Sequence, residues 1–354
     1  MSTLRNLYHG DTHFDFVGRR RLWFTISVVL LGVSILALVF RGLNLSVDFV
    51  GGSLIESENP AGASVGEVRN AVDDAGVANA KVQLTGGGSG IRVQTGELTI
   101  EQEDRTAQAV ADVAGVPVDE VSRTTVGPTF GSQITAAAVR ALIIFLIVAS
   151  LFIWIRLEWE MALAALAALF HDLLLTAGIY SLIGFEVSPA TVIAILTILG
   201  YSLYDTVVVF DKVIENVEER GDKHTISSIV NMSMNQVLMR SINTSLTSLL
   251  PIGSLLFVGS FLLGASTLRE FALALFIGVA SGTYSSIFVA SPLLAVGKER
   301  EEHWKQVRRR LARKGQEDAV FSARERAALE ESVAPVVDRP AAVARPPRKR
   351  RKSR

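Results

Sequence analysis

Long apolar stretches constrain the fold of this chain more than any other feature of its sequence. Each stretch is nearly free of charged residues and approaches the ~20 residues that a helix needs to cross the hydrocarbon core of a bilayer. The stretches cover residues 22–40, 136–155, 161–183, 190–210, 242–263 and 271–296. Hydrophobic residues make up 49% of the 354 residues, which is more than a soluble domain usually contains. We therefore predict an α-helical polytopic membrane protein with six transmembrane helices.

Basic residues between the apolar stretches predict the orientation of the chain. The arginines at 19–21 come just before the first stretch, which lacks a small-residue cleavage site, so we expect a retained helix with a cytoplasmic amino end. The same side would hold Arg156, Lys212, Arg220, Lys223 and the tail from Lys298, whereas the loop near Arg269 on the other side has only that base. By the positive-inside rule, the segment between the first two stretches is extracytoplasmic and both termini are cytoplasmic.

The predicted organisation follows from these stretches and from their flanking charges. Residues 1–21 are a cytoplasmic segment, 22–40 the first transmembrane helix, 41–133 an extracytoplasmic domain, 134–297 transmembrane helices two to six, and 298–354 a basic, largely disordered cytoplasmic tail. Residues 341–354 contain no acidic side chain, so this end is either simply solvated or contacts anionic lipid or ribosomal RNA. The chain has no cysteine, which excludes disulfides and thiolate metal sites.

The predicted extracytoplasmic domain alternates between strand and helix patterns over residues 45–125. We expect strands at 47–56, 81–85, 91–95 and 118–125, and helices at 64–75 and 100–113. The order β-α-β-β-α-β is the split βαβ arrangement, so we expect a small α+β ferredoxin-like domain with one open sheet face. The glycines at 86–88 and 90 fit a hairpin turn, because no lysine and hydroxyl residue follow them in Walker spacing.

Asp205 places a carboxylate inside the apolar stretch 190–210. A charge at bilayer depth costs roughly 2.5–3.5 kcal/mol on insertion scales, which makes such a residue a functional candidate. Arg240 lies toward the cytoplasmic end of the next, antiparallel span, so the two side chains could meet at a similar depth. Asp205 can bind and release a proton, whereas Arg240 would act as a fixed counter-charge. The alternative is a static buried pair that only fixes packing.

Two other site types are alternatives for the polar residues. His9, Asp11, His13 and Asp15 alternate along the chain and are metal-ligand types, but the further motifs of a metallophosphoesterase are missing. Asp172 and Asp205 could form the carboxylate pair of an intramembrane protease, but no Gly-x-Gly-Asp motif occurs. We therefore expect no metal site, no cofactor and no enzymatic activity.

Several segments resemble the SecF family of the bacterial SecDF protein-export complex, in family order and at family spacing. GYSLYDTVVVFDKVIEN resembles the family's fourth-span signature, and VDFVGGSLIE resembles its segment after the first span. VGPTFGSQI, FHDLLLTAGIYSL and MNQVLMRSINTSLTSLLP resemble the second, third and fifth spans. The family often has asparagine where this chain has Tyr204.

The resemblance implies an RND-like bundle in the bacterial inner (cytoplasmic) membrane that works with SecD. In this family an ion gradient, of H+ or possibly Na+, assists translocation of a preprotein through the SecYEG channel, with SecA and YajC as further partners and no requirement for nucleic acid. The resemblance assigns ion coupling to Asp205 and Arg240. Secondary candidates in the polar membrane core are His171, Asp172, Tyr201, Ser202, Thr244 and Thr247. For His171, a hydrogen-bonded core histidine is the alternative.

A stand-alone RND-like exporter of lipid or small molecules is the alternative function. Such an exporter normally carries both halves of the transmembrane repeat, or about twice the predicted number of spans, so a chain of this size favours one half of a heteromeric complex.

Overall fold

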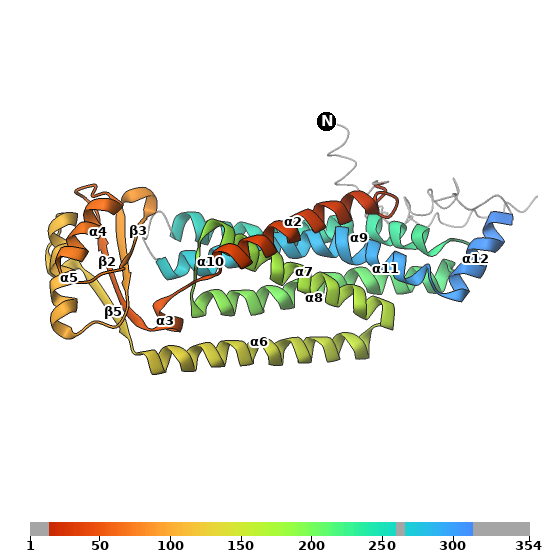
Figure 1. The fold of residues 1–354 in the computed structure, drawn as a ribbon. Coiled ribbons are helices and arrows are strands. Elements are labelled where there is room, and N and C mark those ends of the chain that lie inside the picture. Colours follow the sequence, from red (N-terminus) through yellow and green to blue (C-terminus); the bar gives the residue numbers. More distant parts are fainter. Residues whose placement is uncertain (1–13, 260–265, 314–354) are drawn as a thin grey trace, which may run out of the picture.

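The computed structural model describes residues 14–259 and 266–313 (Figure 1). The pattern at His9, Asp11 and His13 and the end of the basic tail lie outside these residues. Figure 1 shows long helices side by side in a bundle, with a sheet-containing domain at one end and the short helix α12 (Glu302–Arg313) at the other.

Within the described residues, six helical segments are long and apolar enough to cross a membrane, and one coincides with each predicted stretch. They are α2 (Arg20–Arg41), α6 (Pro128–Arg156), α7 (Trp159–Ile183), α8 (Pro189–Arg220), α9 (Ile226–Ser254) with η3 (Leu255–Gly259), and α10 (Ser266–Ser285) with η4 (Ser286–Ala290) and α11 (Ser291–Lys298). The predicted mostly helical fold with six candidate spans is therefore confirmed.

The candidate spans differ in how much of their surface the rest of the chain covers. In an apolar 18-residue window of each span, 56% of the residues are buried in α7 and in the α10 segment, whereas only 11% are buried in α2 and in α6. Large apolar side chains such as Phe40 on α2 and Ile155 on α6 are exposed. Exposed apolar surface of this extent is typical of helices that face lipid or partner helices.

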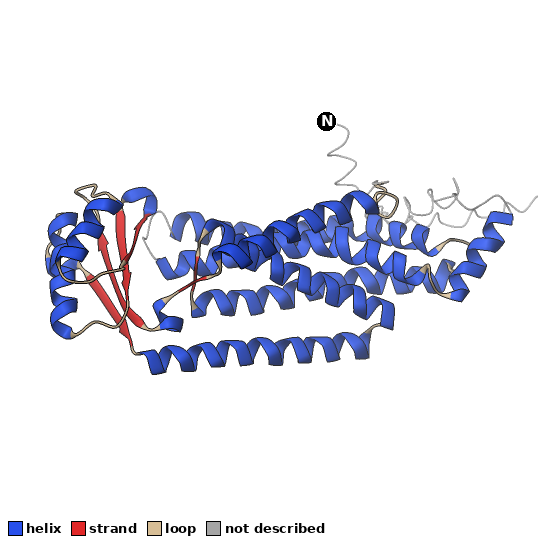
Figure 2. Cartoon of the chain, in the orientation of Figure 1, coloured by secondary structure: helices blue, strands red, loops and turns tan. Residues whose placement is uncertain are grey.

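The domain at one end contains a four-stranded antiparallel sheet (Figure 2). Its strands are β2 (Gly52–Glu58), β3 (Lys81–Thr85), β4 (Gly90–Thr95) and β5 (Ser122–Val126), in the order β3-β4-β2-β5. Helices α4 (Val65–Asp74) and α5 (Ile100–Ala114) pack on one face of the sheet, and both begin with a capping box. The order of strands and helices agrees with the prediction from the sequence.

Two predicted strands begin later than expected. Residues 47–50 form the short helix α3 (Val47–Val50), not the start of a strand, and β2 begins only at Gly52. Gly51 and Gly52 have φ angles of 77° and 117°, which L side chains rarely adopt, so the chain turns sharply here before it enters the sheet. The last strand is likewise shorter, because η2 (Val118–Glu120) precedes β5.

A second, two-stranded sheet joins the domain to the bundle. β1 (Asn44–Leu45) runs parallel to β6 (Glu186–Val187), which lies in the connection between α7 and α8. The segment that enters the domain is therefore hydrogen-bonded to the domain-facing end of the bundle.

The start of the predicted tail differs from the expected disordered segment. Residues 302–313 form α12, and its buried residues Trp304, Val307 and Leu311 join the main core of the bundle. The apolar residues recur at helical spacing among basic ones, so one face of α12 can be buried while the other stays charged.

Candidate functional site

Asp205 lies on α8 and faces α9. Its side chain is buried, with 7% of the residue surface exposed. The Ser241 hydroxyl on α9 donates a hydrogen bond of 2.9 Å to Oδ1 of Asp205. The other oxygen, Oδ2, is buried and has no hydrogen-bond partner among the residues that the structure describes. The carboxylate at this position is thus only half satisfied.

Arg240 lies beside Asp205 but does not contact it. Its side chain is exposed and donates to the Tyr204 hydroxyl at 3.4 Å, and within the described ranges no ion pair links Arg240 to Asp205. Consecutive residues of a helix point about 100° apart, so Ser241 rather than Arg240 faces Asp205 in this conformation. The predicted coupling role of the pair stays a prediction.

Asp172 has a complete set of hydrogen-bond partners. The hydroxyls of Ser202 and Ser285 donate to its Oδ2 at 2.5 and 2.7 Å, and Ser281 donates to its Oδ1 at 2.8 Å. His171 Nδ1 lies 3.2 Å from Oδ1, and only 1% of the Asp172 surface is exposed. Asp172 therefore ties α7 to α8 and α10 through a fully buried polar network.

A chain of hydroxyls extends from the Asp172 network toward Asp205. The main-chain carbonyl of Ser202 accepts hydrogen bonds from Thr206 and Ser286, and the hydroxyls of these two residues lie 3.0 Å apart. Ser286 begins η4, a π-helical segment. π-Helical turns inside longer helices occur frequently at functional sites.

The remaining predicted candidates lie apart from both carboxylates. Tyr201 accepts a hydrogen bond from Ser248 at 3.3 Å. Thr244 and Thr247 donate to carbonyls of their own helix, and Thr247 is exposed. The structure therefore brings Ser202 to Asp172, but places no other secondary candidate of α8 or α9 on a buried carboxylate.

One group of carboxylates in the described part of the chain is close enough to hold a metal ion. Its members are Glu158, Glu160 and Glu301, at the end of the bundle near α12. The Lys298 ammonium donates hydrogen bonds to Glu158 and to Glu301, so a cation already occupies this group.

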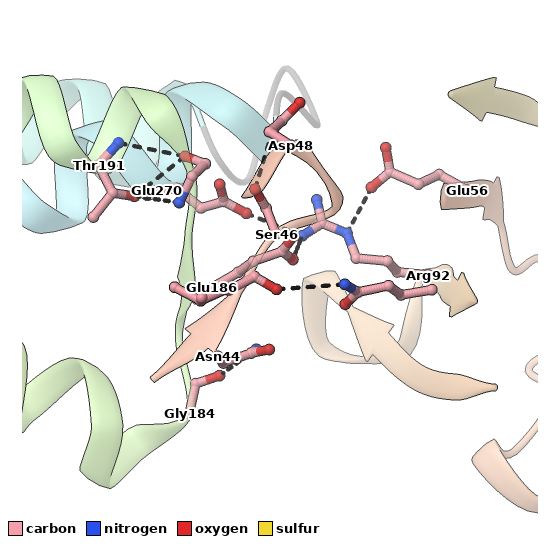
Figure 3. A network of polar contacts seen from close by, with 12 residues as sticks. Asn44, Ser46, Asp48, Glu56, Arg92, Gly184, Glu186, Thr191 and Glu270 are labelled. Atoms are coloured by element: carbon pink, nitrogen blue, oxygen red, sulfur yellow. Dashed lines mark hydrogen bonds and ion pairs between the residues drawn. The ribbon is translucent and has the colours of Figure 1, made fainter. Parts of the chain in front are cut away.

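An ionic cluster with a buried arginine joins the sheet domain to the bundle (Figure 3). Arg92 on β4 donates from Nε to Glu56 at 2.7 Å, and from Nη1 to Glu186 at 2.5 Å and Glu270 at 3.0 Å. Glu56 belongs to the domain, whereas Glu186 lies in β6 and Glu270 at the start of α10. We call Arg92, Glu56, Glu186 and Glu270 the docking cluster.

Burial and neighbouring charges shift the pKa values of Arg92 and Glu186 in opposite directions. Burial alone would lower the pKa of Arg92, but Glu186, Glu56 and Glu270 outweigh it and raise that pKa. Burial raises the pKa of Glu186 above its ordinary value, and Arg92 only partly offsets this effect. The docking cluster was not predicted from the sequence. A signal for it was present, because Ile91 and Val93 face the domain core and the charged residue between them must lie on the opposite face of the sheet.

Two parts of the sequence match known protein families. Residues 106–300 match the family described as "Protein export membrane protein SecD/SecF, C-terminal". Residues 36–56, which include Gly51 and Gly52, match the "SecD/SecF GG Motif".

Individual relatives match over most of the chain. Protein translocase subunit SecF of Streptomyces coelicolor is 41% identical over 327 residues, which cover 92% of this chain and 87% of the relative. SecF of Mycobacterium tuberculosis H37Rv is 41% identical, covering 90% of this chain and 76% of the relative. A crystal structure of SecDF from Thermus thermophilus, described as a translocon-associated membrane protein, superimposes with a TM-score of 0.75 at 34% identity, covering 82% of this chain and 39% of that chain.

Proposed function

This chain belongs to the SecD/SecF family of protein export membrane proteins as a SecF-type translocase subunit, and we propose that it uses a transmembrane ion gradient to assist translocation. The protein would act as an RND-like transmembrane half that pairs with SecD. It would help draw a preprotein from the SecYEG channel, with SecA and YajC as further partners. The coupling ion would be H+ or possibly Na+, and no cofactor is needed.

The half-satisfied carboxylate of Asp205 is the observation that carries this proposal. An ionised carboxylate in an apolar span is costly, and one hydroxyl donor offsets only part of that cost. Binding of a proton or Na+ would neutralise it, and release would restore the charge. A small rotation of α9 would bring Arg240 toward the charged form, so the two forms of Asp205 would favour different helix arrangements.

Pairing with SecD is supported by the uncovered side of the bundle near Asp205. Tyr204 is 57% exposed, and Arg240 and Thr247 are exposed beside it. Polar residues on a membrane helix normally face other helices and not lipid, so we propose that SecD covers this side.

The experiment that tests this function is copurification. A stable complex with the SecD of the same organism is expected, and the chain should restore export in cells depleted of SecF. A chain that purifies only with copies of itself and does not restore export would support the stand-alone exporter instead.

We also propose that the sheet domain is ferredoxin-like and extracytoplasmic, and that the bundle lies in the bacterial inner membrane with both termini cytoplasmic. The strand order β3-β4-β2-β5 with two helices on one face supports this fold class. A reporter fused after Thr95 should then be extracytoplasmic, and one fused after Arg313 cytoplasmic. Reversal of either location would contradict this topology.

A further inference from the structure

The docking cluster connects the sheet domain and the bundle, which have separate hydrophobic cores. Ile91 and Val93 of β4 belong to the core of the sheet domain, and Arg92 between them points from the opposite face of the sheet. Its side chain is only 6% exposed, because it ends between Glu186 and Glu270 of the bundle. Two carboxylates of the bundle therefore bind the Arg92 side chain of the domain.

The charges of the docking cluster do not balance. One guanidinium faces the three carboxylates of Glu56, Glu186 and Glu270. The positive charge of Lys81 on β3 also acts to lower the pKa of Glu186, but the ammonium group donates its hydrogen bond to Asn44. Glu186 and Glu270 both contact the same nitrogen, Nη1 of Arg92, so their carboxyl groups are close neighbours.

Two neighbouring buried carboxylates repel each other when both are ionised. Near this end of α7, the Tyr180 hydroxyl donates a hydrogen bond to the main-chain carbonyl of Glu270. A cleft of about 640 Å³ is lined by residues of both the domain and the bundle, among them Lys81, Gln94 and Gly184.

We propose that Arg92 is the positioning residue that docks the sheet domain on the bundle, and that ionisation of Glu186 breaks this contact, which we call the dock. When Glu186 carries a proton, fewer negative charges surround Arg92 and the repulsion among the carboxyl groups is small. Loss of that proton adds a buried negative charge, which is relieved when the domain moves away and water enters. The dock is a property of this chain whether or not Asp205 couples export to an ion gradient.

The direction of the pH effect follows from Glu186. Its pKa is raised in the docked state because burial disfavours its charge. A carboxyl group with a raised pKa favours the docked state at low pH, and this contribution is lost as the pH rises through the raised pKa. The dock should therefore be closed in mildly acidic solution and should open in alkaline solution.

The absence of native cysteines allows a direct distance measurement on the full chain. Spin labels on Asp73→Cys, exposed on α4, and Leu182→Cys, exposed at the domain-facing end of α7, report the separation of domain and bundle. In lipid nanodiscs the unsubstituted cluster should give one short distance at mildly acidic pH and a growing population of longer distances at alkaline pH.

Three variants separate the dock from general instability. Arg92→Gln should give the long distances at both pH values. Glu186→Gln mimics the protonated form and should keep the short distance at both. Arg123→Gln is the matched control, because it removes an ion pair with Asp104 on the helix-covered side of the same domain, and it should behave like the unsubstituted protein.

Two results would overturn the proposal. The first is a short distance in Arg92→Gln at both pH values. The second is a pH-dependent distance that persists in Glu186→Gln. The distances are measured without SecD, a preprotein or a gradient, so failure of the dock is distinguishable from failure of the proposed export function.

Discussion

Asp205→Asn should abolish gradient-dependent export while the protein stays folded and bound to SecD. Asparagine keeps the shape and the Oδ1 acceptor for Ser241, but it cannot titrate, so the two states that would drive the motion no longer differ. Oδ2 has no partner to lose among the described residues. We expect a change in stability below about 1.5 kcal/mol, the scale of one hydrogen bond. Export into membrane vesicles, SecD copurification and thermal unfolding measure the three effects.

Asp211→Asn is the matched control for this variant. Asp211 is on the same helix, but it forms an exposed ion pair with Arg156, so its substitution should change neither export nor stability appreciably. A purely structural role of Asp205 makes a different prediction. In that case export would stay gradient-dependent in Asp205→Asn and in the double variant with Arg240→Gln, because Arg240 is exposed and is not held by Asp205. Normal export by the double variant would contradict ion coupling at Asp205.

Substitution of Asp172 by alanine should have the opposite profile, with a large loss of stability. Three serine hydroxyls and His171 Nδ1 contact this carboxylate, and none of them has access to bulk water there. Each buried donor left unsatisfied costs about 1–3 kcal/mol, so with partial relaxation we expect a loss on the order of 3 kcal/mol or more. Thermal unfolding of the purified complex measures this loss.

Two further variants show whether the loss of stability in Asp172→Ala comes from the buried network. Asp172→Asn keeps one acceptor oxygen and should be destabilised less than Asp172→Ala. Asp211→Ala removes an exposed carboxylate and should cost at most about 1 kcal/mol. Equal stability of Asp172→Ala and Asp211→Ala would show that the buried network does not hold α7, α8 and α10 together.

The spans and the domain helices could be predicted from the sequence because their signals are local. Apolar stretches of membrane length fixed the six spans, and Ser64 with Glu67 and Thr99 with Gln102 form capping boxes at the starts of α4 and α5. Residues 47–50 were misassigned because an alternating pattern does not reveal the positive φ angles at Gly51 and Gly52, which delay the strand.

The sites were less predictable because they depend on how helices face one another. The sequence placed Asp205 and Arg240 at a similar depth, but depth does not fix rotation about the helix axis, and Ser241 faces the carboxylate. Arg92 was missed for another reason. Its partners Glu186 and Glu270 are 94 and 178 residues away in the sequence, and only the docking of the domain brings them together.

Preprotein export measured in proteoliposomes that contain SecYEG, SecA, SecD and this chain tests ion coupling at Asp205 most directly. Proton and sodium gradients are imposed separately, and the rate of preprotein release is measured for the unsubstituted protein, Asp205→Asn and Asp211→Asn. We predict that one of the two gradients accelerates release with the unsubstituted protein and with Asp211→Asn, and that neither gradient does so with Asp205→Asn. Acceleration of the same size with Asp205→Asn would contradict the proposed function of this carboxylate.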